Sequence, residues 1–191
     1  MKQERRRFSQ EEYLDRQLKT RKSMNALNVE VLIVYDPANM FWLTGYDGWS
    51  FYVHQCVVIT TDGGLFWYGR GIDAKGAELT TDLELNNILS YPDDYVMSPE
   101  RHPMEFLAII LKEKGLHNKR IGLEKDNYYF SARAAESLYS SLPAATFGSC
   151  TISEGELTVF VSTNFPSALN TSYLTPISTP VNVNSPILGF G

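Results

Sequence analysis

Histidines, an acidic pair and a glycine turn are the residues of this 191-residue chain whose types suit catalysis or ligand binding. The three histidines, His54, His102 and His117, stand at no metal-ligand spacing. His117 follows a predicted helix and is expected to be solvated, whereas His102 precedes a proline and is suited to cap a helix. Only His54, which adjoins a loop dense in aromatic residues, is expected to belong to a site.

The segment Gly69–Ala74, G-R-G-I-D-A, matches the G-x-G-x-x-A pattern of dinucleotide-binding turns, with Asp93 and Asp94 about 20 residues further on. Against nucleotide binding, the strand before it is expected to be the far arm of a hairpin, and Asp73 would repel a pyrophosphate. The alternative is a glycine turn that starts a helix. The two acids also suit a two-metal carboxylate site, although a solvated turn after Pro92 is the simpler interpretation.

Aromatic side chains are densest between residues 39 and 54, N-M-F-W-L-T-G-Y-D-G-W-S-F-Y-V-H. Gly45 and Gly48 allow positive φ and a close approach of the rings. Taken alone, such a cluster fits a core as well as a site. The chain contains no H-E-x-x-H, G-x-S-x-G or P-loop motif.

Composition excludes several classes of function. The net charge of −5 argues against nucleic acid or an anionic membrane as the main partner. No apolar run approaches the roughly 20 residues that span a bilayer, and the basic N-terminus lacks the apolar region of a secretory signal. Cys56 and Cys150 lie far apart and form no metal or redox motif. We expect a reduced, cytoplasmic protein with 43% hydrophobic residues in a normal globular core.

Charge divides the chain into three parts. All 17 Lys and Arg residues lie at or before Arg133, and only two charged residues follow Thr151. We therefore expect a basic N-terminal extension at 1–8, one folded domain at 9–151, and an irregular tail rich in Ser, Thr, Asn and Pro at 152–191.

Hydrophobic periodicity predicts helices that alternate with strands. Helices are expected at 9–27, 38–43, 71–81, 104–115 and 135–142. Strands are expected at 29–35, 54–60, 65–68, 87–91, 119–124 and, as a last edge strand, 145–148. The first helix starts with a capping box and should bury Tyr13, Leu14, Leu18 and Met24. The result is an α/β fold with a mixed β-sheet flanked by helices.

Three segments together resemble the N-terminal domain of the creatinase, prolidase and aminopeptidase P family: D-P-A-N-M-F-W-L-T-G-Y-D-G-W-S-F-Y-V-H, F-W-Y-G-R-G-I-D-A and R-I-G-L-E-K-D-N-Y-Y-F. Within the family the match looks closest to ectoine hydrolase and creatinase-like enzymes. The resemblance implies a mixed sheet with a ribonuclease H-like motif. It covers residues 9–151.

Full-length members of that family carry a second, pita-bread domain, which in the peptidases binds two divalent metals. The resemblance implies that this chain lacks that domain, so we expect no catalytic residue, no metal ligand, no cofactor and no turnover. In creatinase-like relatives the N-terminal domain leans over the active site of a partner subunit. By that resemblance the substrate-facing residues are Trp49, Tyr52 and His54, with Arg70 and Asp73 as weaker candidates.

The chain is thus expected to be the substrate-capping and dimerising part of a C–N hydrolase for a small molecule or peptide. Two alternatives stay open. One is a non-catalytic interaction module that pairs with itself or with a full-length paralogue through exposed aromatic residues. The other is dinucleotide binding at Gly69–Ala74. Neither nucleic acid nor a membrane is an expected partner.

Overall fold

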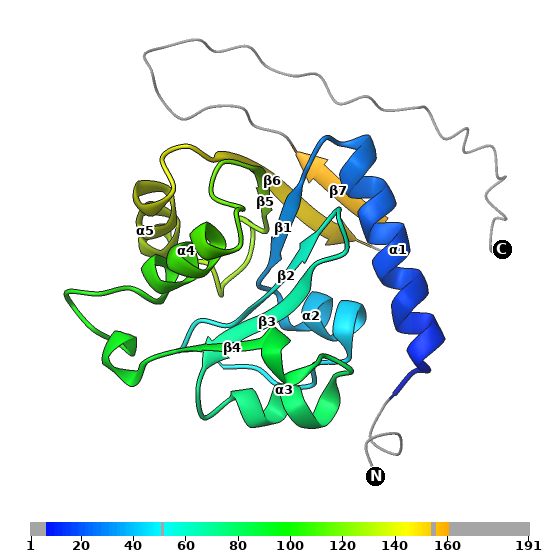
Figure 1. The fold of residues 1–191 in the computed structure, drawn as a ribbon, viewed down its shortest axis with the longest axis horizontal. Helices are drawn as coiled ribbons and strands as arrows, with labels where there is room; N and C mark the ends of the chain where they lie inside the picture. The colour runs from blue at the N-terminus through cyan, green and yellow to red at the C-terminus, as the bar shows by residue number, and fades with distance from the viewer. Residues whose placement is uncertain (1–6, 51, 154–155, 161–191) are drawn as a thin grey trace, which may run out of the picture.

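The computed structural model of the chain describes residues 7–50, 52–153 and 156–160. In this part of the chain a seven-stranded sheet has the strand order β4-β3-β2-β1-β5-β6-β7 (Figure 1). The strands are β1 (Val31–Val34), β2 (Cys56–Thr60), β3 (Leu65–Arg70), β4 (Ile88–Tyr91), β5 (Arg120–Leu123), β6 (Thr146–Ser153) and β7 (Glu156–Phe160). The helices are α1 (Gln10–Ala26), α2 (Pro37–Thr44), α3 (Ala74–Thr80), α4 (Pro103–Glu113) and α5 (Ala132–Ser141), with short 3₁₀ turns η2 (Leu85–Asn87) and η3 (Asp93–Tyr95).

The sheet is mixed, as the sequence predicts. Strand β1 pairs antiparallel with β2 and parallel with β5, β3 is antiparallel to β2 and parallel to β4, and β6 is parallel to β5. The carboxyl ends of β1, β3, β4 and β5 therefore lie together at the edge where β2 begins. We call this side of the sheet, with the loops at 45–50, 52–55, 71–73, 92–102 and 124–131, the carboxyl edge. Ligand sites of open α/β sheets commonly occupy this position.

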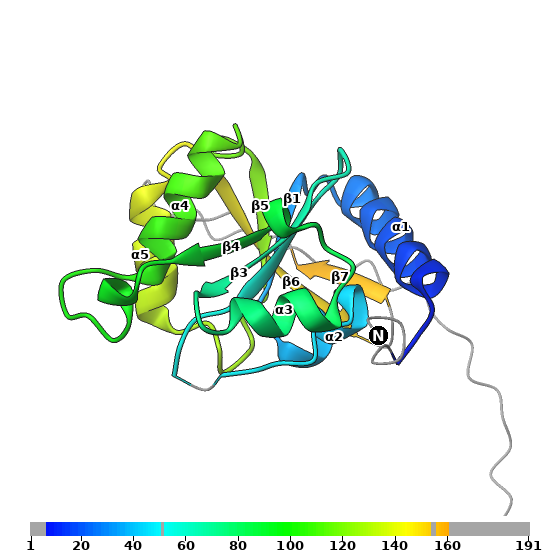
Figure 2. The same ribbon diagram turned by 60° about the horizontal axis from the view of Figure 1, so that its bottom comes forward.

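Two cores cover the two faces of the sheet, because alternate side chains of a strand point to opposite faces. Val31 and Ile33 of β1 belong to one core together with Leu107 of α4. Leu32 and Val34 belong to the other core, which also contains residues of α1, α2 and α3. In Figure 2, α4 and α5 lie on one side of the sheet and the other three helices lie on the opposite side.

Helix α1 buries a different stripe from the predicted one. Tyr13, Arg16, Thr20 and Met24 are buried, whereas Leu14 and Leu18 are 51% and 64% exposed. The prediction was wrong for these two leucines. The buried positions follow Tyr13 at helical spacing, and they include Arg16, whose polar groups have hydrogen-bond partners in the interior. At the start of the helix Ser9 Oγ accepts the Glu12 N–H at 3.2 Å, which confirms the serine half of the predicted capping box, whereas the Glu12 carboxylate accepts a hydrogen bond from Arg16.

The sheet continues beyond the expected last strand. Strand β6 runs to Ser153, and β7 pairs with it antiparallel from Ser149↔Phe160 to Ser153↔Glu156. The segment at 145–148 is therefore not an edge strand. Residues 156–160, which the sequence analysis assigned to the irregular tail, form the outer strand β7. The rest of the expected tail, residues 161–191, lies outside the described residues.

Candidate functional site

The loop between α2 and β2 contains exposed aromatic side chains and one buried tyrosine, Tyr46, which attaches the loop to the core. Tyr46 is 2% exposed, its hydroxyl donates to Gln55 Oε1 at 3.1 Å, and its ring lies 5.5 Å from the ring of Trp67. Gly48 lies against this tyrosine, since a Cβ there would stand 2.7 Å from the Tyr46 hydroxyl oxygen. Burial raises the pKa of Tyr46 well above its usual value, so it stays a neutral hydrogen-bond donor.

Beyond this anchor the loop turns outward. Trp49 and Tyr52 are 61% and 50% exposed, which is unusual for rings of this size. Ser50 Oγ accepts the Val53 N–H at 3.2 Å and so turns the chain back toward β2. The same short loop therefore combines a rigid attachment with two accessible aromatic side chains, as a recognition loop requires.

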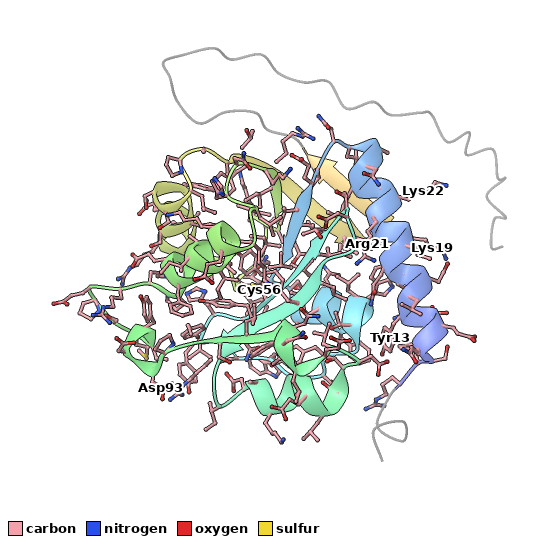
Figure 3. All side chains as sticks on the ribbon, viewed as in Figure 1. Tyr13, Lys19, Arg21, Lys22, Cys56 and Asp93 are labelled. Carbon is pink, nitrogen blue, oxygen red and sulfur yellow. The ribbon has the colours of Figure 1, made fainter. Side chains whose placement is uncertain are left out.

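Arg70 and Asp93 close the carboxyl edge next to this loop. Arg70 ends β3, and its Nε and Nη2 lie 2.8 and 3.3 Å from the two carboxylate oxygens of Asp93. Asp93 follows β4 and is labelled in Figure 3. This two-point bond raises the pKa of Arg70, with a smaller contribution from Tyr52, and lowers that of Asp93. The predicted substrate-facing arginine is therefore already paired with a carboxylate.

Two histidines face each other behind the loop. The rings of His54 and His102 have centroids 4.6 Å apart. His102 is 6% exposed, and its Nδ1 accepts the Met104 N–H at 3.1 Å, which confirms the predicted helix cap on α4. Burial, the His54 ring and Arg133 together lower the pKa of His102 to about 4. Burial also lowers the pKa of His54, although a hydrogen bond with the Tyr129 backbone acts in the opposite direction. Both rings are therefore neutral at pH 7.

His54 Nδ1 is buried and makes no hydrogen bond to the described residues. Unsatisfied buried polar atoms are rare and point to strain or to a missing ligand. The backbone carbonyl of His54, in contrast, accepts the Tyr91 hydroxyl at 3.1 Å. His54 is thus held both by its ring, which has a hydrogen bond with the Tyr129 backbone, and by its own carbonyl group.

The histidine pair lines a pocket of about 190 Å³ at the carboxyl edge. Its walls come from the loop before β2, the end of β4 and the starts of α4 and α5. The lining residues are Tyr52, Val53, His54, Tyr91, Tyr95, Val96, Met97, Ser98, Arg101, His102, Pro103, Ser131 and Arg133. Of the predicted site residues, the structure brings Tyr52 and His54 together here, and it places Trp49, Arg70 and Asp73 outside the lining.

The glycine turn after β3 differs from the prediction in one respect. Strand β3 is the far arm of a hairpin, but it also pairs parallel with β4 across α3, so β3-α3-β4 is a βαβ unit. Helix α3 has seven residues, and its N-cap Asp73 makes no side-chain capping bond. The charge of Asp73 raises the pKa values of Tyr46 and Tyr91, so it lies near the loop anchor. Asp93, the acid expected to bind a ribose, is paired with Arg70.

The acids Asp93 and Asp94 are exposed, and each forms an ion pair with an arginine, Asp94 with Arg101. Within the described ranges no three His, Cys, Asp or Glu side chains are grouped so as to hold a metal ion. The ligand set for a metal-dependent step is therefore not found in this part of the molecule. Among the same residues, no helix is long and apolar enough to cross a bilayer.

Sequence reasoning missed a buried carboxyl group. Glu124, which ends the R-I-G-L-E segment, is 3% exposed and accepts the N–H groups of Tyr35 and Asp36 at 2.7 and 2.8 Å and the Asn39 amide at 2.6 Å. Burial raises its pKa to about 7, although the three hydrogen bonds act in the opposite direction. Glu124 thereby joins β5 to the start of α2, the helix that leads into the aromatic loop. A glutamate directly after a buried strand was the available signal.

Known proteins share the sequence of this domain. The family model described as the creatinase/prolidase N-terminal domain matches residues 16–154. The chain belongs to this family. The creatinase/prolidase domain is 51% identical over 141 residues to ectoine hydrolase from Halomonas elongata, an alignment that covers 73% of this chain and 35% of that protein. It is 43% identical to the uncharacterized hydrolase/peptidase y4tM from Sinorhizobium fredii, covering 73% of this chain and 36% of the relative.

The chain thus spans about a third of the length of these relatives. Solved structures share the fold of the creatinase/prolidase domain. A proline dipeptidase from Streptococcus agalactiae matches with a TM-score of 0.57 at 14% identity, over 72% of this chain and 94% of that one. Xaa-Pro dipeptidase from Bacillus anthracis matches with a TM-score of 0.56 at 11% identity, over 72% of this chain and 33% of that one. The resemblance drawn from the sequence is confirmed.

Proposed function

We propose that this creatinase/prolidase domain caps the active site of a partner subunit in a C–N hydrolase that resembles ectoine hydrolase, and that it dimerises through the carboxyl edge. The 191-residue chain by itself has no turnover in this proposal. The observation that carries it is the loop before β2, where Trp49 and Tyr52 are exposed on an anchor formed by buried Tyr46. The 51% identity to ectoine hydrolase over the domain supports the choice of relative.

The physical argument concerns the substrate. Ectoine-like and creatine-like molecules combine a delocalised cation with a carboxylate. An exposed aromatic face attracts such a cation, with about 0.5–2 kcal/mol depending on how dry the site becomes. Trp49 and Tyr52 offer these faces, because both rings are exposed. Arg70 and Asp73 act as supports of the loop in this proposal, since Arg70 already binds Asp93.

Dimerisation is tested by light scattering coupled to size-exclusion chromatography. The chain has a mass of 21.6 kDa, and the proposal predicts a particle of twice this mass. Replacing both exposed rings (Trp49→Ser with Tyr52→Ser) should give a monomer that still unfolds cooperatively, with a thermal midpoint lowered only by the loss of the dimer. The matched control is Leu85→Ser, because Leu85 is 69% exposed but lies on η2, away from the carboxyl edge. A wild-type monomer would contradict the proposal.

A second candidate is a non-catalytic interaction module that pairs with a full-length paralogue, and the same exposed rings favour it. Chromatography of the chain mixed with that paralogue separates the two. A mixed complex that forms at the expense of the homodimer supports the second candidate. Dinucleotide binding at Gly69–Ala74 is tested by thermal shift with NAD and NADP, where a clear stabilisation would revive it.

A further inference from the structure

Helix α1 presents two leucines to solvent on the side opposite its buried face. The buried face consists of four side chains at the spacing i, i+3, i+7 and i+11, namely Tyr13, Arg16, Thr20 and Met24. The exposed residues Glu11, Leu14, Leu18 and Lys22 have the same spacing and start two residues earlier. Two residues correspond to about 200° around an α-helix, so this second series runs along the outer face. We call these four residues the outer stripe.

The middle of the outer stripe is apolar. Leu14 and Leu18 are 51% and 64% exposed, and they are neighbours because they lie one helical turn apart. Leu14 also borders a hollow of about 140 Å³, whose wall includes Leu65 and Leu83. The apolar surface therefore continues from α1 toward β3. A contiguous apolar patch on an exposed helix is typical of a surface that binds another protein.

The two ends of the outer stripe carry opposite charges. Other charged side chains of α1 are paired within the helix, as Asp15 is with Lys19 at 2.6 Å. Glu11 and Lys22 form no ion pair with the described residues. Figure 3 shows Lys22 pointing away from the sheet. Along the helix the stripe thus has a negative charge, two leucines and a positive charge.

This order of charges makes the stripe complementary to a second copy of itself that runs in the opposite direction. In an antiparallel pair of α1 helices, Leu14 faces the partner's Leu18, and Glu11 faces the partner's Lys22 at both ends. A parallel pair would place like charges together at each end, which is unfavourable. Charges that flank an apolar seam commonly set the partner and the direction of paired helices.

We propose that the outer stripe of α1 binds the outer stripe of a second copy in an antiparallel helix pair with two-fold symmetry. The interface is small, so we expect a Kd on the order of 1 mM. This contact is not formed at the micromolar concentrations of chromatography. The inference goes beyond the proposed function, because α1 lies outside the loops of the carboxyl edge. In the concentrated wild-type chain it joins carboxyl-edge dimers into larger particles.

The test is an NMR dilution series of the full 191-residue chain that carries Trp49→Ser and Tyr52→Ser, so that only the α1 contact remains. Between about 0.02 and 2 mM the rotational correlation time should rise from that of a monomer toward that of a dimer. The amide signals of the outer stripe should shift along the same binding curve. A monomer at every concentration would overturn the inference. Failure of the carboxyl-edge dimer is seen separately, in chromatography of the wild type.

Charge exchange tests the partner and the direction. Glu11→Lys makes both ends of the stripe positive, and Lys22→Glu makes both ends negative. Each change should weaken self-association by about tenfold, because two attractive contacts become repulsive. The two changes together in one chain should restore most of the affinity, since the stripe is again complementary to itself. Unchanged self-association in Glu11→Lys would refute the antiparallel pair.

The matched controls lie on α4, on the other side of the sheet. Glu113→Lys and Lys112→Glu make the same changes of net charge at exposed positions and should leave the Kd unchanged. Leu14→Ala with Leu18→Ala keeps good helix formers and should abolish self-association. Ile109→Ala, at a position that is 44% exposed, should have no effect. Equal effects of the α1 and α4 variants would show non-specific association and would overturn the inference.

Discussion

Helix α1 and the carboxyl edge differ in which side chains they bury and which they expose. On α1, Arg16 is 8% exposed, its Nε lies 3.0 Å from Glu12, its Nη1 donates to the Trp42 carbonyl at 3.0 Å, and its guanidinium lies 4.2 Å above the Phe8 ring. Gln17 bonds the Leu43 carbonyl, and Arg21 bonds the Thr60 carbonyl. In Figure 3, Arg21 points toward the sheet, whereas Lys19 and Lys22 point away from it.

The carboxyl edge, marked by Asp93 in Figure 3, shows the reverse pattern. Rings that would stabilise a core, those of Trp49 and Tyr52, are exposed there. A group that is buried and hydrogen-bonded contributes to stability, whereas an exposed ring leaves apolar area that a ligand or partner can bury. The comparison therefore supports a stabilising role for α1 and the binding role proposed for the carboxyl edge, and each role is open to a direct test.

The largest effect is expected on α1. Arg16→Met should lower the free energy of unfolding by about 3 kcal/mol, because it leaves Glu12 and the Trp42 carbonyl without a buried partner. Urea denaturation measures this loss. Lys19→Met, which removes an exposed ion pair with Asp15, is the control and should not change the midpoint. A loss below about 0.5 kcal/mol in Arg16→Met would remove the contrast between the two regions.

Glu124 should make stability depend on pH. Its pKa is about 7 in the folded chain against 4.5 unfolded, so its stabilising contribution is present below pH 4.5 and is lost as the pH rises through 7. Glu124→Gln should abolish this pH-dependent loss, which amounts to up to about 3 kcal/mol in the free energy of unfolding.

The pKa values of His54 and His102 are lowered, so these rings add stability as the pH rises through 6.5 and act in the opposite direction. The measured quantity is therefore the difference between wild type and Glu124→Gln in denaturation at pH 4.5 and 7.5. A difference that does not change with pH would show that Glu124 stays ionised.

A smaller effect is expected at the loop anchor. Gly48→Ala places a methyl group 2.7 Å from the Tyr46 hydroxyl oxygen, so the tyrosine has to shift. The free energy of unfolding should fall by about 1–2 kcal/mol. Gly71→Ala, at a position with open space around the added Cβ, is the matched control and should leave it unchanged. Equal behaviour of the two variants would mean that Tyr46 does not anchor the loop.

The smallest effect is expected at His54. His54→Phe removes the hydrogen bond between the ring and the Tyr129 backbone, so the free energy of unfolding should fall by about 1 kcal/mol. Calorimetry measures the change, and an unchanged or higher stability would show that this contact does not stabilise the loop before β2.

Much of the fold was predictable because strands and helices differ in their hydrophobic period. The continuous apolar run of β1 and the stripe of Leu107 and Leu111 on α4 are examples, and both were found from the sequence. The burial of Arg16 was not predictable, since it depends on the carbonyl of Trp42 and on the ring of Phe8, which only the fold brings close. Leu14 and Leu18 were wrongly assigned to the core, because hydrophobicity alone does not show which side of α1 packs against the sheet.

The site was predictable in part. Tyr52 and His54 were chosen through the family resemblance, and the structure places both in one pocket. His102 was predicted as a cap, but not as a neighbour of His54, because 47 residues lie between them and only the fold brings the two rings together.

The central claim is that the carboxyl edge binds and does not catalyse. It is tested most directly by incubating the pure 191-residue chain with ectoine and Mn²⁺ and following the substrate by NMR. The account predicts ectoine signals that lose no intensity over a day. Formation of hydrolysis product that disappears in His54→Phe would contradict it, because the reacting groups would then lie in this domain.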